Sequence, residues 1–167
     1  MNNKTRKIAF LGIFSAIALI LSYVEALLPP IWAAVPGVKI GLPNIIIIFL
    51  LYKCSLKDAV LVSLVRLILV SLLFGNFMMF LYSLAGAVLS LLIMAILKKT
   101  DFLSIIGVSV AGAVAHNLGQ IIAAVILLQT NEIGYYMIIL AITGTLAGIF
   151  VGIIGSLVIK KTENVII

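Results

Sequence analysis

The stretch IAFLGIFSAIALILSYVEALL, residues 8–28, indicates the fold class of this chain. As an α-helix these residues would be about 31 Å long, which matches the hydrocarbon thickness of a bilayer. The stretch follows Lys4, Arg6 and Lys7, as the apolar part of a signal peptide would. It is long for such a segment, however, and it ends in Pro29-Pro30 instead of a small-residue cleavage site. We therefore expect it to be retained as a membrane-spanning helix.

The rest of the chain has the same character. Of its 167 residues 65% are hydrophobic and 10% are charged, and the mean hydropathy is +1.39, which leaves too little polar surface for a soluble globule. Further apolar runs give six predicted spans in all, at residues 8–28, 38–52, 59–74, 77–97, 103–128 and 133–159. We expect a single all-α domain, a bundle of six membrane-spanning helices in the lipid bilayer.

The basic residues predict the orientation of this bundle. With the N-terminus inside, nine of the eleven obey the positive-inside rule, namely Lys4, Arg6, Lys7, Lys53, Lys57, Lys98, Lys99, Lys160 and Lys161. Both termini are then cytoplasmic. The net charge of +6 does not indicate a nucleic-acid partner, because the basic residues stand beside helix ends and form no clustered footprint.

Residues for catalysis or metal binding are scarce. The single cysteine, Cys54, falls on the predicted cytoplasmic side and excludes an intrachain disulfide or a thiol cluster for a metal. The two aspartates, Asp58 and Asp101, stand singly at inner helix ends, where we expect them to be solvated. With no glycine-rich phosphate loop either, we expect no reaction centre, metal or cofactor, and ATP-driven work would come from another subunit.

Small residues predict where the helices pack, since helices in lipid associate through close backbone approach. Two stripes recur every four residues: Gly144, Gly148 and Gly152 in the sixth span, and Gly107, Ala111, Ala115, Gly119 and Ala123 in the fifth. The first span carries Gly12 and Ala16 near the cytoplasm, and on a second stripe Ser15, Ala18, Ser22 and Glu25. One of its faces is expected to meet the bundle and the other to be free for a partner.

The second span has two interpretations. A proline is favoured in the first turn of a helix, so a helix that begins near Pro43 and ends at Tyr52 would be about 15 Å long and start within the membrane. Its unpaired N–H groups would then need polar partners. Alternatively, residues 36–42 continue the helix to the surface.

Polar residues inside the spans are the candidate binding residues. A charged residue at mid-membrane costs about 2.5 to 3.5 kcal/mol on insertion scales and usually serves a site or a pairing. The candidates gather towards the outer half of the bundle, while the inner half is almost purely apolar, and they are Glu25, Lys39, Asn44, Arg66, Asn76, Tyr82, His116, Asn117 and Gln120, with Ser83 beside Tyr82. Because Arg66, Lys39 and a helix N-terminus would face one acid, we expect an anionic ligand. The alternative is a structural ion pair of Glu25 with Arg66 or Lys39.

The outer connection from Pro29 to Pro36 is apolar and contains three prolines and Trp32. It would fold over the mouth of a site as a lid, or lie at the membrane interface as an anchor.

Several segments carry a resemblance to a known family. They are LSYVE at 21–25, VKIGLPN at 38–44, LFG at 73–75, YSLAG at 82–86 and GAVAHNLGQ at 112–120. In these the chain resembles the bacterial membrane family labelled heptaprenyl diphosphate synthase component I, also called the Gx transporter family. One departure is Pro43, at a position where that family is expected to have a small residue.

That family in turn resembles the substrate-binding S components of energy-coupling factor (ECF) transporters. The resemblance implies six helices with cytoplasmic ends in the bacterial cell membrane, a ligand site towards the outside, and a vitamin-like or precursor substrate. It also implies docking through Gly12 and Ala16 to a transmembrane coupling protein, the T component, which works with two ABC ATPases.

Two other functions stay open. The family label suggests a subunit of a prenyl diphosphate synthase, although the paired aspartate-rich motifs of such enzymes are absent from this sequence. A non-catalytic membrane subunit for menaquinone synthesis, or for flavin or quinone electron transfer, would need no deep ligand pocket.

Overall fold

The computed structural model describes residues 3–28, 40–130 and 132–162, and within these ranges every regular element is helical. The elements in order are α1 (Asn3–Leu27), α2 (Asn44–Lys53), α3 (Leu56–Leu73), α4 (Phe77–Thr100), α5 (Ile105–Leu128), the short 3₁₀ helix η1 (Glu132–Tyr136) and α6 (Met137–Lys161). The all-α prediction is confirmed for the part of the chain described.

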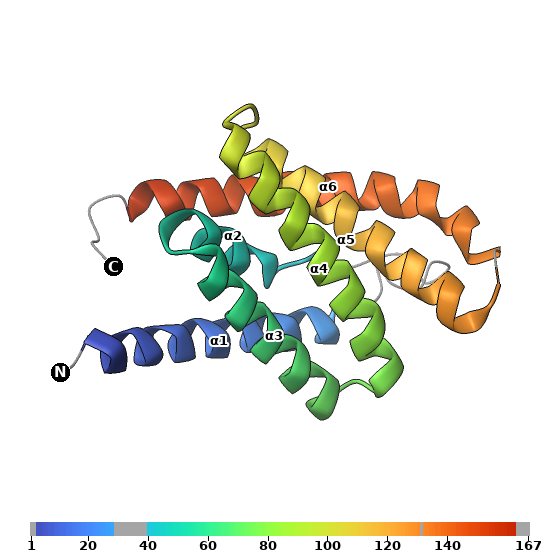
Figure 1. Cartoon of the computed structure of the whole chain (residues 1–167), viewed down its shortest axis with the longest axis horizontal. Helices are drawn as coiled ribbons and strands as arrows, with labels where there is room; N and C mark the ends of the chain where they lie inside the picture. Colours follow the sequence, from blue (N-terminus) through green and yellow to red (C-terminus); the bar gives the residue numbers. More distant parts are fainter. Residues whose placement is uncertain (1–2, 29–39, 131, 163–167) are drawn as a thin grey trace.

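The helices form two groups that meet along the middle of the molecule. In one group α5 packs against both α4 and α6; in the other α3 packs against α1. The short α2 lies between the groups and contacts α1, α3 and α6, while α3 also contacts α4. Figure 1 shows α1 and α6 on opposite sides, with the start of α1 and the end of α6 at the same end of the molecule.

Four helical segments are long and apolar enough to cross a membrane: Lys4–Leu27, Phe77–Thr100, Ile105–Leu128 and Glu132–Lys161. They indicate a membrane protein. The other two predicted spans differ in kind within the described residues, because α2 has only 10 residues and the 18-residue α3 carries the charges of Lys57, Asp58 and Arg66.

The helix-break interpretation of the second span is confirmed. Residues 40–43 are not helical, and α2 begins directly after Pro43. Gly41 has a φ of 80°, a conformation that favours glycine. The first N–H groups of α2 donate to carbonyls of this turn, with Asn44 N 2.9 Å from Gly41 O. The break therefore supplies most of the partners that the helix start needs.

Apolar burial explains the central place of α2. Every residue from Ile46 to Leu51 is buried, and Leu50 has no exposed surface. A helix that is apolar on all sides is stable only when other elements surround it. Phe49 also stacks on Phe14 of α1, with ring centroids 5.2 Å apart.

Glycines bring the backbones of α4, α5 and α6 into contact; these three helices are called the α4–α6 group. A methyl group on Gly148 would lie 2.6 Å from Val110 Cα of α5, and one on Gly152 would lie 2.8 Å from Ile106 Cα. The predicted seam of the sixth span is thus confirmed. In α5, Gly119 has the same role against Ala85 O of α4 at 2.7 Å, whereas Gly107 packs against Leu103, just before its own helix.

At the end of the molecule where α1 starts and α6 ends, lysine side chains bond backbone carbonyls of neighbouring helices. Lys98 of α4 donates to Leu51 O at the end of α2 and lies 5.2 Å from the centroid of the Tyr52 ring. Lys53 of α2 donates to Thr162 O, just after α6, at 3.2 Å. Basic side chains therefore join α2 to α4 and to the end of α6.

One prediction for this end is wrong. Asp58 is buried, not solvated, and its carboxylate lies 2.8 Å from Lys7 Nζ of α1. Its backbone N–H also donates a hydrogen bond to the hydroxyl of Ser55, which caps α3. The reason is that α1 packs across the start of α3, which the sequence of α3 alone does not reveal. Asp101 is exposed, as predicted.

Candidate functional site

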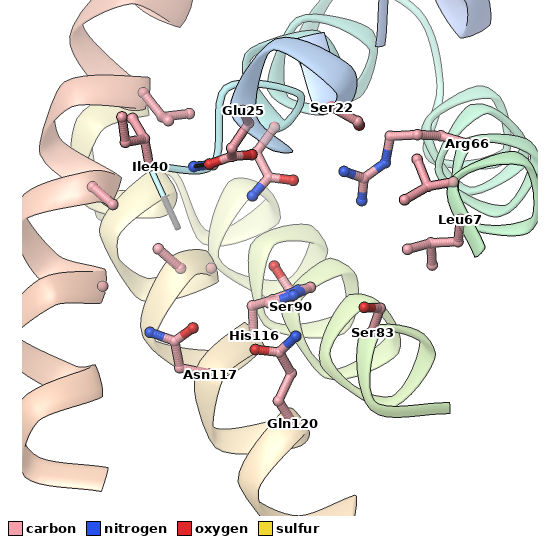
Figure 2. Close-up of a pocket in the computed structure, with 18 of the residues that line it drawn as sticks. Ser22, Glu25, Ile40, Arg66, Leu67, Ser83, Ser90, His116, Asn117 and Gln120 are labelled. Carbon is pink, nitrogen blue, oxygen red and sulfur yellow. Dashed lines mark hydrogen bonds between the residues drawn. The ribbon is translucent and has the colours of Figure 1, made fainter. Parts of the chain in front are cut away.

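A cavity of about 340 Å³ lies between the two groups of helices. Its lining includes residues of all six α-helices and of the turn before α2. The volume lies within the range of small-molecule pockets, which is about 300 to 1,000 Å³. Figure 2 shows polar side chains entering this space from α1, α3, α4 and α5.

The cavity brings together most of the polar residues singled out in the sequence. Those that line it are Glu25, Asn44, Arg66, Ser83, His116, Asn117 and Gln120. They come from five helices, so their meeting depends on the tertiary fold. The fold thus places charged and neutral hydrogen-bonding side chains around one cavity.

Arg66 is the main cation of this group within the described residues. Its guanidinium points from α3 into the cavity (Figure 2). Its Nε is buried and has no hydrogen-bond partner among the described residues. An unmade hydrogen bond at a buried donor costs about 1 to 3 kcal/mol, and more for a charged group. Arg66 is therefore suited to bind an acceptor that enters the cavity.

Glu25 does not form the ion pair with Arg66 that was one of the two alternatives, and the pairing with Lys39 lies outside the described residues. Its carboxylate accepts a hydrogen bond from the backbone N–H of Gly41, and within the described ranges no salt bridge joins it to Arg66. The charge of Glu25 still acts on Arg66 across the cavity. Glu25 thus holds the turn that leads into α2, and it places a negative charge close to the positive end of that helix.

His116 and Gln120 lie one turn apart on α5, beside the closest approach of α4. A methyl group on Gly86 would lie 2.7 Å from His116 O and 2.9 Å from Gln120 Cγ. Since Gly86 has no side chain, His116 and Gln120 can occupy the space between α4 and the cavity. Figure 2 shows both side chains on the α5 side, across the cavity from Arg66.

Asn117 has a structural bond as well as a place on the cavity. Its amide nitrogen donates to Leu140 O of α6 at 2.7 Å. Gly144 leaves the space for this amide, because a methyl group there would lie 2.6 Å from Asn117 Nδ2. Asn117 therefore ties α5 to α6, and its oxygen and its second N–H are left to bind a ligand.

Other candidates lie elsewhere. Asn76 is exposed and caps α4, accepting from Met79 N at 2.9 Å, and neither it nor Tyr82 belongs to the cavity lining. An asparagine just before a helix commonly has this capping role. Lys39 and the connection from Pro29 to Pro36 lie outside the described residues.

The cavity also reaches polar residues that the sequence did not single out. Ser71, Ser90 and Ser109 line it, and Ser90 and Ser109 are buried. The half of the bundle that was expected to face the cytoplasm is therefore less apolar than predicted. The available signal was the spacing of Ser83 and Ser90, which are seven residues apart and so share one face of a helix.

The two faces of α1 differ as expected. Ser15, Ala18 and Ser22 are buried against the bundle. Gly12 and Ala16 are exposed, and nothing lies within 4 Å of a methyl group placed on Gly12. Exposed Ile13, Ile17 and Ile20 surround them. This face is apolar and has room for close approach of another helix.

The chemistry of the site favours binding. Among the described residues no group of three or more His, Cys, Asp and Glu side chains is placed to hold a metal. The cavity can take an acceptor at Arg66 and orient it by neutral hydrogen bonds from His116 and Gln120.

Comparison with known families gave one finding. The family described as heptaprenyl diphosphate synthase component I matches residues 14–158, which include all the cavity-lining residues. Comparisons with curated proteins and with solved structures gave no match.

Proposed function

The chain belongs to the heptaprenyl diphosphate synthase component I family, and from this premise we propose that it is the solute-binding membrane subunit of an ECF-type importer. Its ligand is a small anionic molecule, of a vitamin-like, isoprenoid, quinone or flavin-related kind. The observation that carries the proposal is Arg66, a half-buried cation that points into a cavity and whose buried Nε has no partner among the described residues. A subunit with only a structural role would have no need of this arrangement.

The architecture supports the same function. In the proposal all six helices lie within the bilayer, α2 as a half-length helix inside the bundle, and both termini are in the cytoplasm of a bacterium. The cavity then lies towards the outer ends of α1 and α3, where Glu25 and Phe74 line it. Lysines close the opposite end. A solute would enter from outside and be held above a closed inner end.

The partners of the proposal are a transmembrane coupling protein and two ABC ATPases. The exposed face of α1 around Gly12 and Ala16 is the docking surface, since small residues allow a second helix to approach closely. ATP hydrolysis belongs to the partners, so this chain is not itself an enzyme.

The family description favours a second candidate, a non-catalytic membrane subunit that works with a prenyl diphosphate synthase. Such a subunit would associate with a soluble synthase and would not need to bind a solute. A subunit for flavin or quinone electron transfer belongs to the same class. The two candidates differ in what co-purifies with the chain.

The test is mass spectrometry of small molecules released from the purified protein. Wild type should release an anionic compound, and Arg66→Gln should lower its affinity by about 10- to 100-fold, the effect of one hydrogen bond to a charged group. Arg66→Lys should restore it only in part, because an ammonium lacks the planar fork of donors. Lys57→Gln, an exposed site on the same helix, is the control.

An empty wild-type protein that co-purifies with a diphosphate synthase would overturn the importer proposal. Unchanged retention of the compound in Arg66→Gln would overturn the role of Arg66.

A further inference from the structure

Two buried serines line the part of the cavity that lies inward of His116, and their hydroxyls make no hydrogen bond to a described residue. Ser90 of α4 is 7% exposed and Ser109 of α5 is 3% exposed, and both line the cavity. Within the described ranges neither hydroxyl makes a hydrogen bond. By contrast, the hydroxyl of Ser22 donates to Ala18 O at 2.8 Å, the usual way in which a serine inside a helix is satisfied.

The depth of these serines follows from the packing of α4 against α5. Gly86 lies against His116, and one turn further in Ser90 Oγ is 3.3 Å from the position of a methyl group on Gly112. Ser109 precedes His116 by seven residues, which is about 10 Å along a helix. The cavity thus has an outer polar level at Arg66, His116 and Gln120, and an inner level formed by Ser90 about one turn and Ser109 about two turns further in.

The walls between the two levels are mostly small or apolar. They include Gly112, Ala113, Ala147, Gly148 and Val151. These residues offer no side-chain hydrogen bonds, so a molecule that filled this part would have a slender, apolar middle. Its polar groups would be placed at its ends.

We propose that the ligand is an elongated molecule with two polar ends, an anionic group at Arg66 and a hydroxyl, carbonyl or amide that reaches Ser90 and Ser109, the second of which lies about 10 Å along α5 from His116. This inference rests on the proposed function, since Arg66 is its outer anchor. It narrows the substrate class, because a compact anion such as inorganic phosphate reaches one level only. Both serines can donate and accept, so each end group named here can be bound.

The test uses the full chain in detergent and two series of probes. One series consists of ω-hydroxycarboxylates of increasing chain length, and the other of the alkanoates of equal length without the hydroxyl. Thermal unfolding gives the apparent affinity of each probe, since a ligand that binds only the folded state raises the midpoint. The terminal hydroxyl should improve affinity by about 2- to 10-fold, the effect of one hydrogen bond, and only at lengths that span both levels.

Serine variants assign this gain to the inner level. Ser90→Ala and Ser109→Ala should each lower the ratio of the affinity for the hydroxycarboxylate to the affinity for the alkanoate of equal length. Ser63→Ala is the matched control, because Ser63 is 3% exposed on α3 and does not line the cavity. Two serines on different helices keep the test decisive should one variant fold poorly.

The failures of the two proposals are distinguishable. If carboxylates bind in an Arg66-dependent manner but the hydroxyl adds nothing at any length, or if its advantage survives both serine variants, the two-ended ligand is excluded and the anion site stands. If neither series stabilises the wild-type chain, the anion site fails and this inference fails with it.

Discussion

The α4–α6 group and the α1–α3 group are held together by different means. In the first, glycines allow backbone to approach backbone, as Gly148 does against Val110 and Gly119 against Ala85. In the second, side chains make the contacts, including the Lys7–Asp58 ion pair and the bond from Gly41 N–H to Glu25. Close packing leaves little room for long charged side chains, and the second group has that room.

The difference extends to the cavity between the groups. Its charged residues, Glu25 and Arg66, come from α1 and α3, whereas His116 and Gln120 come from the tightly packed α5. The glycine-packed group thus supplies neutral hydrogen-bonding side chains in fixed positions. The other group supplies the charges that select the ligand. Three predictions test this division.

The largest effect on stability is expected at the glycine seam. Gly148→Ala should lower the free energy of unfolding by about 1 to 3 kcal/mol, because the added methyl group would lie 2.6 Å from Val110 Cα and force α5 and α6 apart. Chemical unfolding in detergent measures it. Gly12→Ala is the matched control, since its methyl group meets nothing within 4 Å and alanine favours a helix by up to about 1 kcal/mol. Equal stability of the two variants would refute the idea that backbone contact holds this group.

A smaller effect on the free energy of unfolding is expected at Glu25, which joins the end of α1 to the turn before α2. Glu25→Gln weakens the bond from Gly41 N–H and should lower the free energy of unfolding by about 1 kcal/mol. It also removes the negative charge that acts on Arg66, so a carboxylate probe should bind more tightly than to wild type. Thermal unfolding with and without the probe measures both, with the exposed Glu132→Gln as control. Weaker binding would mean that Glu25 contacts the ligand directly, as the sequence suggested.

The smallest effect on the free energy of unfolding is expected at Lys98, which joins α4 to the end of α2. Lys98→Met removes the donor to Leu51 O and the cation beside Tyr52, and should cost about 0.5 to 1 kcal/mol. Lys99→Met, next to it and exposed, should change the unfolding free energy little. Identical unfolding curves for the two variants would show that the contacts of Lys98 do not stabilise the packing of α4 on α2.

Features that depend on one helix at a time could be predicted from the amino-acid sequence. Hydropathy predicted an all-helical chain, Pro43 predicted the break before α2, and the spacing of Gly144, Gly148 and Gly152 predicted a packing seam. Arg66, His116 and Gln120 were identifiable because polar groups in apolar helices are costly and so indicate a site or a pairing.

Only the tertiary structure decided the roles that depend on a neighbouring helix. Asp58 is buried because α1 crosses the start of α3, and the Glu25 carboxylate bonds Gly41 because the turn before α2 lies beside the end of α1. Asn76 caps a helix and does not line the cavity, while Ser109 does, and no local pattern distinguishes these two residues. The physical reason is that a side chain's partner is set by which helices pack together, and that packing is a property of the whole bundle.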